Sequence, residues 1–294
     1  MKRVFRKIKP PGMFFFDSGA FGLFARKEGK TKENRFDYFK TKAFKKYVDK
    51  YAQFILEHES GIDYYANVDV LDNPELSWKV LKYLENKYGL NPVPVIHPMT
   101  DIKWVQKHVE AGYEFIGIGG GGRGRSKADY KIWADGVFTY LCPKSNDYLP
   151  IVRVHGFAMT SFDLMLRYPF WSVDSTSWVQ SAAWGGIYVP HKRKGKFVFT
   201  EAPYVLMVSS DSPTAKNGDA SHYLKCSKME QAIMLEWLKE MNVPLGDDGT
   251  WGVVSEHNAR KVINLRFFER MMNEIPPWPQ PYQSQTLRKG LFDD

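Results

Sequence analysis

Five short runs of apolar, β-branched and aromatic residues share one design along the chain. Each run stops at a single polar residue or at glycine, where the chain turns. Such runs are typical of buried strands, so we expect strands that carry polar groups at their ends. The runs lie at residues 14–21 (FFFDSGAF), 64–70 (YYANVDV), 92–98 (PVPVIHP), 151–157 (IVRVHGF) and 170–178 (FWSVDSTSW).

Amphipathic segments separate these runs. Apolar residues recur at helical spacing within residues 37–59, and Asn73-Pro74 opens a helix that Gly89 closes. Further helices are expected at 101–111, 127–140 and 161–167, with a strand at 115–118. This alternation predicts parallel strands with helical crossovers. Polar strand ends gathered at one mouth favour an α/β fold of the (β/α)8 TIM-barrel type.

Beyond residue 178 the pattern is less regular. Short strands are expected at 187–189, 197–200 and 204–208, a basic linker at 191–196, and helices at 227–241 and 257–274. The 294 residues suffice for a single TIM-barrel domain. It is expected to have a basic leader at 1–12 and a Pro-rich C-terminal tail at 276–294 that begins as an extended or loosely ordered segment.

Charge and cysteine usage narrow the class of protein. The formal net charge of +8 favours an anionic partner such as nucleic acid, although many basic proteins are simply soluble. Cys142 and Cys226 are too few for a disulfide framework or a four-thiolate zinc site, which favours a reducing, cytoplasmic setting. Charges interrupt the leader, so it is a poor signal peptide, and no stretch reaches the roughly 20 apolar residues that span a bilayer.

The order of the strand ends resembles the tRNA-guanine transglycosylase family, and within it the short phage and bacterial relatives that place 7-deazaguanines in DNA. The DSGAF motif at 17–21 is similar to the motif that holds the family's general acid/base aspartate, and Asp174 resembles its nucleophilic aspartate. The resemblance covers roughly residues 14–178. It implies that Asp17 and Asp174 are catalytic, and that the base is bound by Ser18, Phe21, Asp69, His97, Gly119, Gly120, His155 and Gly156.

Two departures from the family pattern affect the expected substrate. His97 stands where the family commonly has a glutamine that reads the base, so recognition of the base edge is expected to differ. The clustered cysteines and histidine of the family's zinc subdomain, which serves tRNA-binding enzymes, are missing. The resemblance therefore implies exchange of guanine in DNA for a preQ0-like 7-deazaguanine, in the bacterial host cytoplasm if the protein is phage-encoded.

Retention of configuration at the sugar requires two displacements, so one carboxylate attacks and another group transfers protons. We expect Asp174 to attack C1′ of a guanosine while Asp17 protonates the leaving guanine, after which a free 7-deazaguanine attacks the covalent intermediate. Phe21 can stack on a purine, and Asp69 can accept from N1–H and the exocyclic amine. The base must leave its stack, so single-stranded or locally opened DNA is the expected substrate. This chemistry requires no cofactor, and no metal site is expected.

Two groups of basic residues can neutralise phosphates near the mouth, although charge runs are usually solvated. One group follows a glycine run and the other forms the basic linker; the residues are Arg123, Arg125, Lys127, Lys192, Arg193, Lys194 and Lys196.

Structural roles remain open for the same residues. Asp174 before Ser and Thr fits a helix N-cap, and Asp17 and Asp69 fit turns. The glycine run lacks the Lys-Ser/Thr ending of a phosphate-binding loop. His97 and His155 fit packed wall positions.

His222 and Cys226 lie four residues apart and make only a weak metal pair. Two other functions also remain open. One is the same base exchange on tRNA. The other is a nucleic-acid-binding barrel without catalysis.

Overall fold

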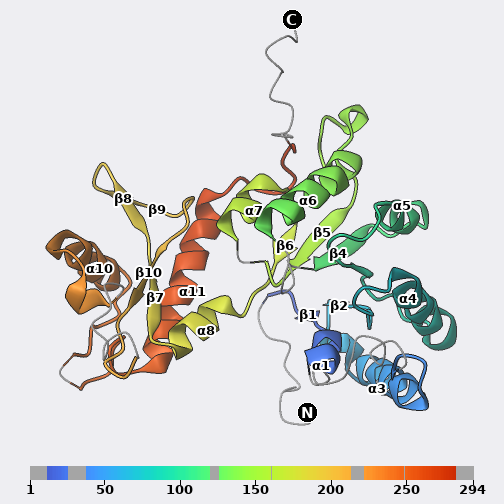
Figure 1. The fold of residues 1–294 in the computed structure, drawn as a ribbon, viewed down its shortest axis with the longest axis horizontal. Coiled ribbons are helices and arrows are strands. Elements are labelled where there is room, and N and C mark those ends of the chain that lie inside the picture. Colours follow the sequence, from blue (N-terminus) through green and yellow to red (C-terminus); the bar gives the residue numbers. More distant parts are fainter. Residues whose placement is uncertain are drawn as a thin grey trace, which may run out of the picture. The chain divides into compact units, whose positions relative to one another are not determined.

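The computed structural model describes residues 12–25, 38–119, 126–159, 161–212, 222–247 and 249–282. The fold is of mixed α/β class (Figure 1). The chain forms two compact units: Met1–Phe157 with Phe170–Ser172 and Pro281–Asp294, and Ala158–Pro169 with Val173–Gln280. A single domain that spans all 294 residues stays a prediction.

Strands of the first unit pair with their neighbours in the sequence. Their bounds are β1 (Phe15–Phe16), β2 (Tyr64–Tyr65), β3 (Val95–Ile96), β4 (Phe115–Gly119), β5 (Arg153–Phe157) and β6 (Ser172–Val173). The boundary between the units falls within β6, so Ser172 belongs to the first unit and Val173 to the second. The pairs β1–β2, β3–β4 and β4–β5 are parallel, and β6 is next to β5. A parallel bridge between Ala66 and Val93 joins β2 to the segment that leads into β3. This confirms the predicted parallel strands.

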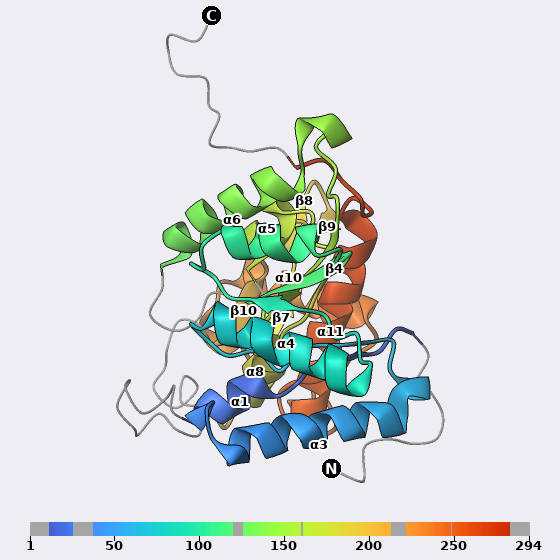
Figure 2. The ribbon, with the colours of Figure 1, turned by 90° about the vertical axis from the view of Figure 1, so that its right-hand side faces the viewer.

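Helices connect these strands, as the alternation predicted. They are α1 (Ala20–Ala25), α3 (Lys42–His58), α4 (Pro74–Tyr88), α5 (Lys103–Glu110) and α6 (Lys127–Leu141), with 3₁₀ turns at Glu59–Gly61 and Lys144–Asn146. Figure 2 shows α3, α4, α5 and α6 in succession on the outer side of the strands. The side chains of Thr41, Asn73 and Ser126 accept backbone N–H groups at the starts of α3, α4 and α6.

The core of the first unit begins with α3. Phe44, Val48, Ala52 and Ile55 recur at helical spacing and are buried with apolar residues of the 66–70 segment and α4. Because α3 buries this stripe, its opposite face is left for charged residues.

Asp49 on that outer face links α3 to α4. Its Oδ1 accepts hydrogen bonds from the hydroxyls of Tyr83 (2.6 Å) and Tyr88 (2.7 Å) and from Lys87 Nζ (3.1 Å), and its Oδ2 from Lys45 Nζ (3.4 Å). Partial burial disfavours the charged carboxylate, but these four donors outweigh it and hold the pKa of Asp49 well below its usual range.

Asp49→Asn is expected to lower the free energy of unfolding near pH 7 by roughly 1–3 kcal/mol, because charged acceptors make the stronger hydrogen bonds. Since folding lowers this pKa, the carboxylate stabilises the fold above its ordinary pKa and loses that effect as the pH falls below about 4. Urea unfolding from pH 3 to 7 measures this, with the exposed Asp147→Asn as control. A wild-type pH dependence that persists in Asp49→Asn would contradict the assignment.

The second unit has a different sheet arrangement. Its β7 (Gly186–Val189) pairs antiparallel with β10 (Tyr204–Met207), and β8 (His191–Arg193) pairs antiparallel with β9 (Lys196–Val198). Its helices are α7 (Phe162–Arg167), α8 (Ser177–Ala183), α10 (Lys228–Glu240) and α11 (His257–Glu274), with a 3₁₀ turn at Tyr223–Lys225.

Asn264 of α11 forms hydrogen bonds to both α8 and β7 in this unit. It is fully buried; its Oδ1 accepts from the backbone N–H of Tyr188 (2.7 Å), and its Nδ2 donates to the carbonyls of Trp178 (3.0 Å) and Gly186 (3.3 Å). Trp237, also fully buried, donates to the Tyr188 carbonyl at 3.1 Å. These contacts fix α8, which follows Asp174, against β7.

Two sequence expectations are corrected, and the structure adds a contact at the C-terminal segment. The basic linker at 191–196 is the β8–β9 hairpin, whose turn residues Lys194 and Gly195 have φ of 48° and 80°. The strand expected at 64–70 is a ladder of only two residues. The segment at 275–282 has neither helix nor strand, yet Tyr282 is buried and donates to Asp135 Oδ1 at 2.9 Å, so the tail is anchored there.

Candidate functional site

Five predicted site residues lie at one edge of the parallel strands in the first unit. Asp17 directly follows β1, Asp69 follows β2 after a short extended segment, and His97 directly follows β3. Gly119 ends β4, and Gly156 is the penultimate residue of β5. Because the strands are parallel, their C-terminal ends share an edge. We call these five residues the strand-end edge.

Asp69 and His97 form a direct pair at this edge. Asp69 Oδ2 and His97 Nε2 are 2.5 Å apart, and both side chains are largely buried. Since an ionised carboxylate only accepts, His97 Nε2 is the donor in this pair; in a neutral ring of that tautomer Nδ1 would be an acceptor. The sequence pointed to both residues separately but not to their contact.

Helix α4 positions Asp69. The Val70 N–H donates to Ser77 Oγ (2.8 Å), Ser77 Oγ donates to the Val70 carbonyl (3.2 Å), and Asn67 Nδ2 donates to the Ser77 carbonyl (3.0 Å). Ser77 thus replaces a neighbouring strand as hydrogen-bond partner, which explains why the β2 ladder is short while the backbone before and after Asp69 is still fixed.

Gly119 gives His97 its space. A Cβ at this position would lie 3.0 Å from His97 Nδ1 and 3.4 Å from Pro98 Cδ, which is closer than side chains normally pack. A side chain at residue 119 would therefore displace the imidazole from the position in which it contacts Asp69.

Gly119→Ala is expected to displace the His97 ring and so to change the geometry of the Asp69–His97 hydrogen bond, which should shift the NMR resonance of the His97 N–H. Gly136→Ala is the control, because a Cβ there meets nothing within 4 Å in the interior of α6. That control should leave the resonance in place and stabilise the protein by up to about 1 kcal/mol. An unchanged resonance in Gly119→Ala would contradict the close approach.

Asp17 and its neighbours form the turn after β1. Asp17 is exposed and its Oδ1 accepts the Gly19 N–H at 3.3 Å, while Gly19 has φ 70°. Ser18 is buried; its Oγ accepts the Ala20 N–H at 3.3 Å, and its carbonyl accepts the hydroxyl of Tyr47 at 2.6 Å. Ser18 therefore anchors the turn that presents the Asp17 carboxylate.

Phe21 and Tyr51 complete this region. Phe21 of α1 is 68% exposed, so its ring is accessible for stacking. The Tyr51 hydroxyl donates to the Ala66 carbonyl at 2.5 Å. Burial raises the pKa of Tyr51 well above its ordinary value, and the negative charges of Asp17 and, to a smaller extent, Asp69 add to this. Both carboxylates therefore favour the protonated, neutral form of this phenol.

His155 has the surroundings of a packed residue. It is buried, its Nδ1 is 2.8 Å from Ser172 Oγ, and its ring stacks on Phe15 with centroids 4.6 Å apart. Phe157 contacts it edge-on at 4.4 Å. His155 thus helps to pack the sheet beneath the strand-end edge, which agrees with the wall position left open above.

Asp174 belongs to the second unit and follows β6 directly. Its Oδ1 accepts the backbone N–H of Ala158 at 2.8 Å, and its carbonyl accepts that of Met159 at 2.8 Å. The N-cap of α8 is Thr176, so the helix-cap role considered for Asp174 is wrong. The carboxylate is exposed and is oriented by the residues that follow β5.

The predicted phosphate-binding residues are spread over both units. Gly120 of the base-binding set, with Arg123 and Arg125, lies outside the described residues. Lys127 is exposed in the first turn of α6, and Lys194 and Lys196 are exposed on the β8–β9 hairpin. Lys192 pairs with Glu236 (2.5 Å) and Arg193 with Glu201 (3.0 Å).

The His222–Cys226 pair does not form a metal site. Cys226 Sγ donates to the His222 carbonyl at 3.5 Å, and His222 Nε2 lies 3.3 Å from the Ser209 carbonyl. Across the described ranges, no group of three or more His, Cys, Asp or Glu side chains is arranged to hold a metal ion. Within those same ranges, no helix has both the length and the apolar character needed to cross a bilayer.

Comparisons with known proteins gave no match to a family model, a curated protein or a solved structure.

Proposed function

We propose that the protein is a (β/α)8-barrel transglycosylase that exchanges guanine in DNA for a 7-deazaguanine base. The observation that carries the proposal is the strand-end edge, which holds Asp17, the Asp69–His97 pair and two glycines on successive parallel strands. Barrel enzymes place their catalytic groups at this end of their strands. Closure of the barrel is part of the proposal.

The base is recognised by the Asp69–His97 pair. Each carboxylate oxygen has two lone-pair directions, so Asp69 can hold His97 and still accept from N1–H and the 2-amino group of guanine. His97 Nδ1 then offers an acceptor beside Gly119, where the close approach leaves no room for a side chain. Phe21 is accessible to stack on the purine face.

Exchange proceeds by two displacements. The Asp174 carboxylate attacks C1′ and the C1′–N9 bond breaks, while Asp17 protonates the leaving guanine. A 7-deazaguanine then attacks C1′ through N9, gives its proton to Asp17 and releases Asp174. Atoms and charges balance without a cofactor. The target nucleotide is single-stranded or flipped out, because a stacked base cannot enter a barrel mouth.

Asp69→Asn is expected to lower kcat/KM for guanine exchange by roughly 10²-fold or more, since an amide presents a donor where guanine needs an acceptor. Preference for guanine over hypoxanthine, which lacks the 2-amino group, should fall with it. Asp72→Asn is the control, because Asp72 is exposed with φ 58°, a conformation that asparagine tolerates. If Asp69→Asn keeps the wild-type preference for guanine over hypoxanthine, residues other than Asp69 recognise the base.

The function is tested by incubating the protein with radiolabelled guanine and single-stranded DNA, matched duplex DNA or tRNA. We expect label in the single strand, less in the duplex and least in tRNA. Label in tRNA alone would establish the tRNA alternative. No incorporation into any substrate, together with no release of guanine when a 7-deazaguanine is supplied, would overturn the proposal.

A further inference from the structure

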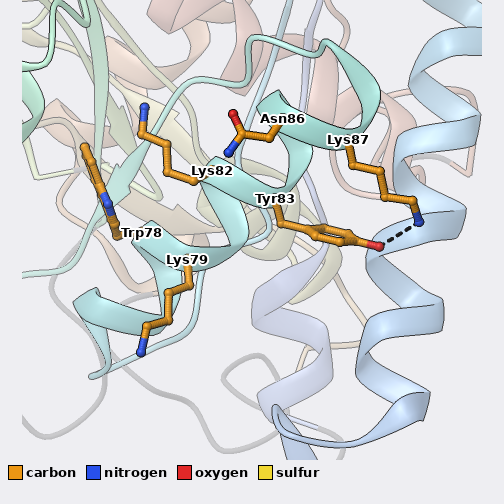
Figure 3. Close-up of a pocket in the computed structure, with 6 residues that line it drawn as sticks. All are labelled: Trp78, Lys79, Lys82, Tyr83, Asn86 and Lys87. Carbon is orange, nitrogen blue, oxygen red and sulfur yellow. Dashed lines mark hydrogen bonds between the residues drawn. The ribbon is translucent and has the colours of Figure 1, made fainter.

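A basic and aromatic hollow lies on the outer face of α4. It has a volume of about 440 Å³ and is lined by Trp78, Lys79, Lys82, Tyr83, Asn86 and Lys87 (Figure 3). These residues are adjacent pairs repeated every four positions, so they share one face of the helix. The lining contains three ammonium groups, one amide and two aromatic rings, and no acidic side chain.

Two lysines converge on one ring of this hollow. Lys82 Nζ lies 4.8 Å and Lys107 Nζ 4.3 Å from the centre of the Trp78 ring, and Lys107 also lies 4.6 Å from that of Trp104. Burial lowers the pKa of His108, and the positive charges of Lys107 and Lys82 add to this. Positive potential is therefore concentrated around Trp78.

The lysines of this hollow differ in how far their charges are available, because Lys87 Nζ is held by Asp49 (3.1 Å) and by the Tyr83 hydroxyl (2.7 Å; Figure 3). Lys82 Nζ is held at a part-buried position by Glu85 (2.7 Å) and by the Tyr113 hydroxyl (2.9 Å). Lys79 Nζ is 2.7 Å from Glu75, with both side chains about two-thirds exposed. An exposed ion pair contributes little to stability and is screened by salt, so an incoming anion can share the Lys79 ammonium at small cost. Lys107 is exposed as well.

We propose that the lysine–tryptophan face, defined as Trp78, Lys79, Lys82, Asn86 and Lys107, binds the phosphate backbone of single-stranded nucleic acid with a base stacked on Trp78. This inference rests on the proposed function, and it assigns a binding surface to the nucleic-acid substrate of that function. Lys79 and Asn86 are seven residues apart, roughly 10 Å along the helix, enough to contact more than one phosphate. Aromatic rings between cations suit single-stranded nucleic acid, whose bases stack without sequence preference.

The test measures binding of a fluorescent 20-nucleotide single strand at several salt concentrations. The charge variant is Lys79→Gln/Lys107→Gln, and the stacking variant is Trp78→Leu. The control is Lys228→Gln/Lys239→Gln, which removes two exposed lysines from α10. Circular dichroism and melting temperature establish that each variant is folded.

We expect the charge variant to bind roughly tenfold more weakly. The slope of log affinity against log salt concentration should fall in magnitude by about 1.4, because each phosphate contact on a single strand contributes about 0.7 and two are lost. Trp78→Leu should weaken binding with little change of slope, and the control variant should resemble wild type. Exchange by the charge variant at saturating DNA should keep its kcat, because the face lies outside the strand-end edge.

Equal affinity and slope in wild type and the charge variant would overturn the inference and leave the proposed function standing. The same variants are also tested on vesicles of anionic lipid. If the charge variant loses binding to the vesicles and keeps its binding to DNA, the inference is overturned as well. Weakened DNA binding by a protein that shows no guanine exchange would support this face and reject the proposed function.

Discussion

Asp174→Asn is expected to lower the rate of guanine exchange by about 10⁴-fold or more. An amide cannot form the glycosyl ester, so the first displacement has no nucleophile. Asparagine retains an oxygen that can accept the Ala158 N–H, now held at 2.8 Å, so the backbone after β5 should stay in place. The rate is measured with radiolabelled guanine and single-stranded DNA.

The matched control is Asp247→Asn, which removes an exposed carboxylate from the same unit. It should exchange guanine at the wild-type rate, and both variants should melt within a few degrees of wild type. Exchange by Asp174→Asn within about tenfold of wild type would show that another group attacks C1′.

Asp17→Asn is expected to slow exchange by roughly 10²–10⁴-fold, the range that general acid catalysis contributes. Asparagine can still accept the Gly19 N–H in the turn after β1, so the loss is of a proton donor rather than of local structure.

A substrate with an activated leaving group separates this role from that of Asp174. The base of 7-methylguanosine already carries a positive charge and leaves as a neutral molecule without protonation. Release of 7-methylguanine from DNA by Asp17→Asn should therefore approach the wild-type rate, while Asp174→Asn stays inactive. The same loss on both substrates in Asp17→Asn would contradict its role as the acid; spontaneous release without protein is subtracted.

The elements that the sequence predicted well are those with local signals. Helix α4 has Asn73 and Pro74 at its start and Gly89, with φ 67°, just after its end, and all three features act within one turn. The order of the parallel strands was also predictable, because each apolar run is followed by an amphipathic segment. These signals need no knowledge of distant contacts.

Features that depend on distant partners were not predictable. Asp69 and His97 are 28 residues apart, and their contact arises only because β2 and β3 place their ends together. The Asp-Ser-Thr pattern at Asp174 is typical of a helix N-cap, but the Asp174 side chain instead accepts the backbone N–H of Ala158, 16 residues earlier. The β8–β9 hairpin was hidden because its charged residues obscure the alternation that marks a strand, although Lys194-Gly195 supplies the turn.

The lysine–tryptophan face illustrates the same limit. Its helix was predictable, but the lysines of α4 look like an ordinary solvated face in the sequence. Only the placement of Lys107 from α5 over Trp78 of α4 shows that charges from two helices meet at one ring.

The most direct test of the central claim is to identify the residue that bonds to DNA. Single-stranded DNA is incubated with the protein without an incoming base, the reaction is quenched with denaturant, and the cross-linked peptide is sequenced by mass spectrometry. We expect an adduct that retains the sugar, lacks one guanine and maps to Asp174. An adduct at another residue, or one that persists in Asp174→Asn, would contradict the account.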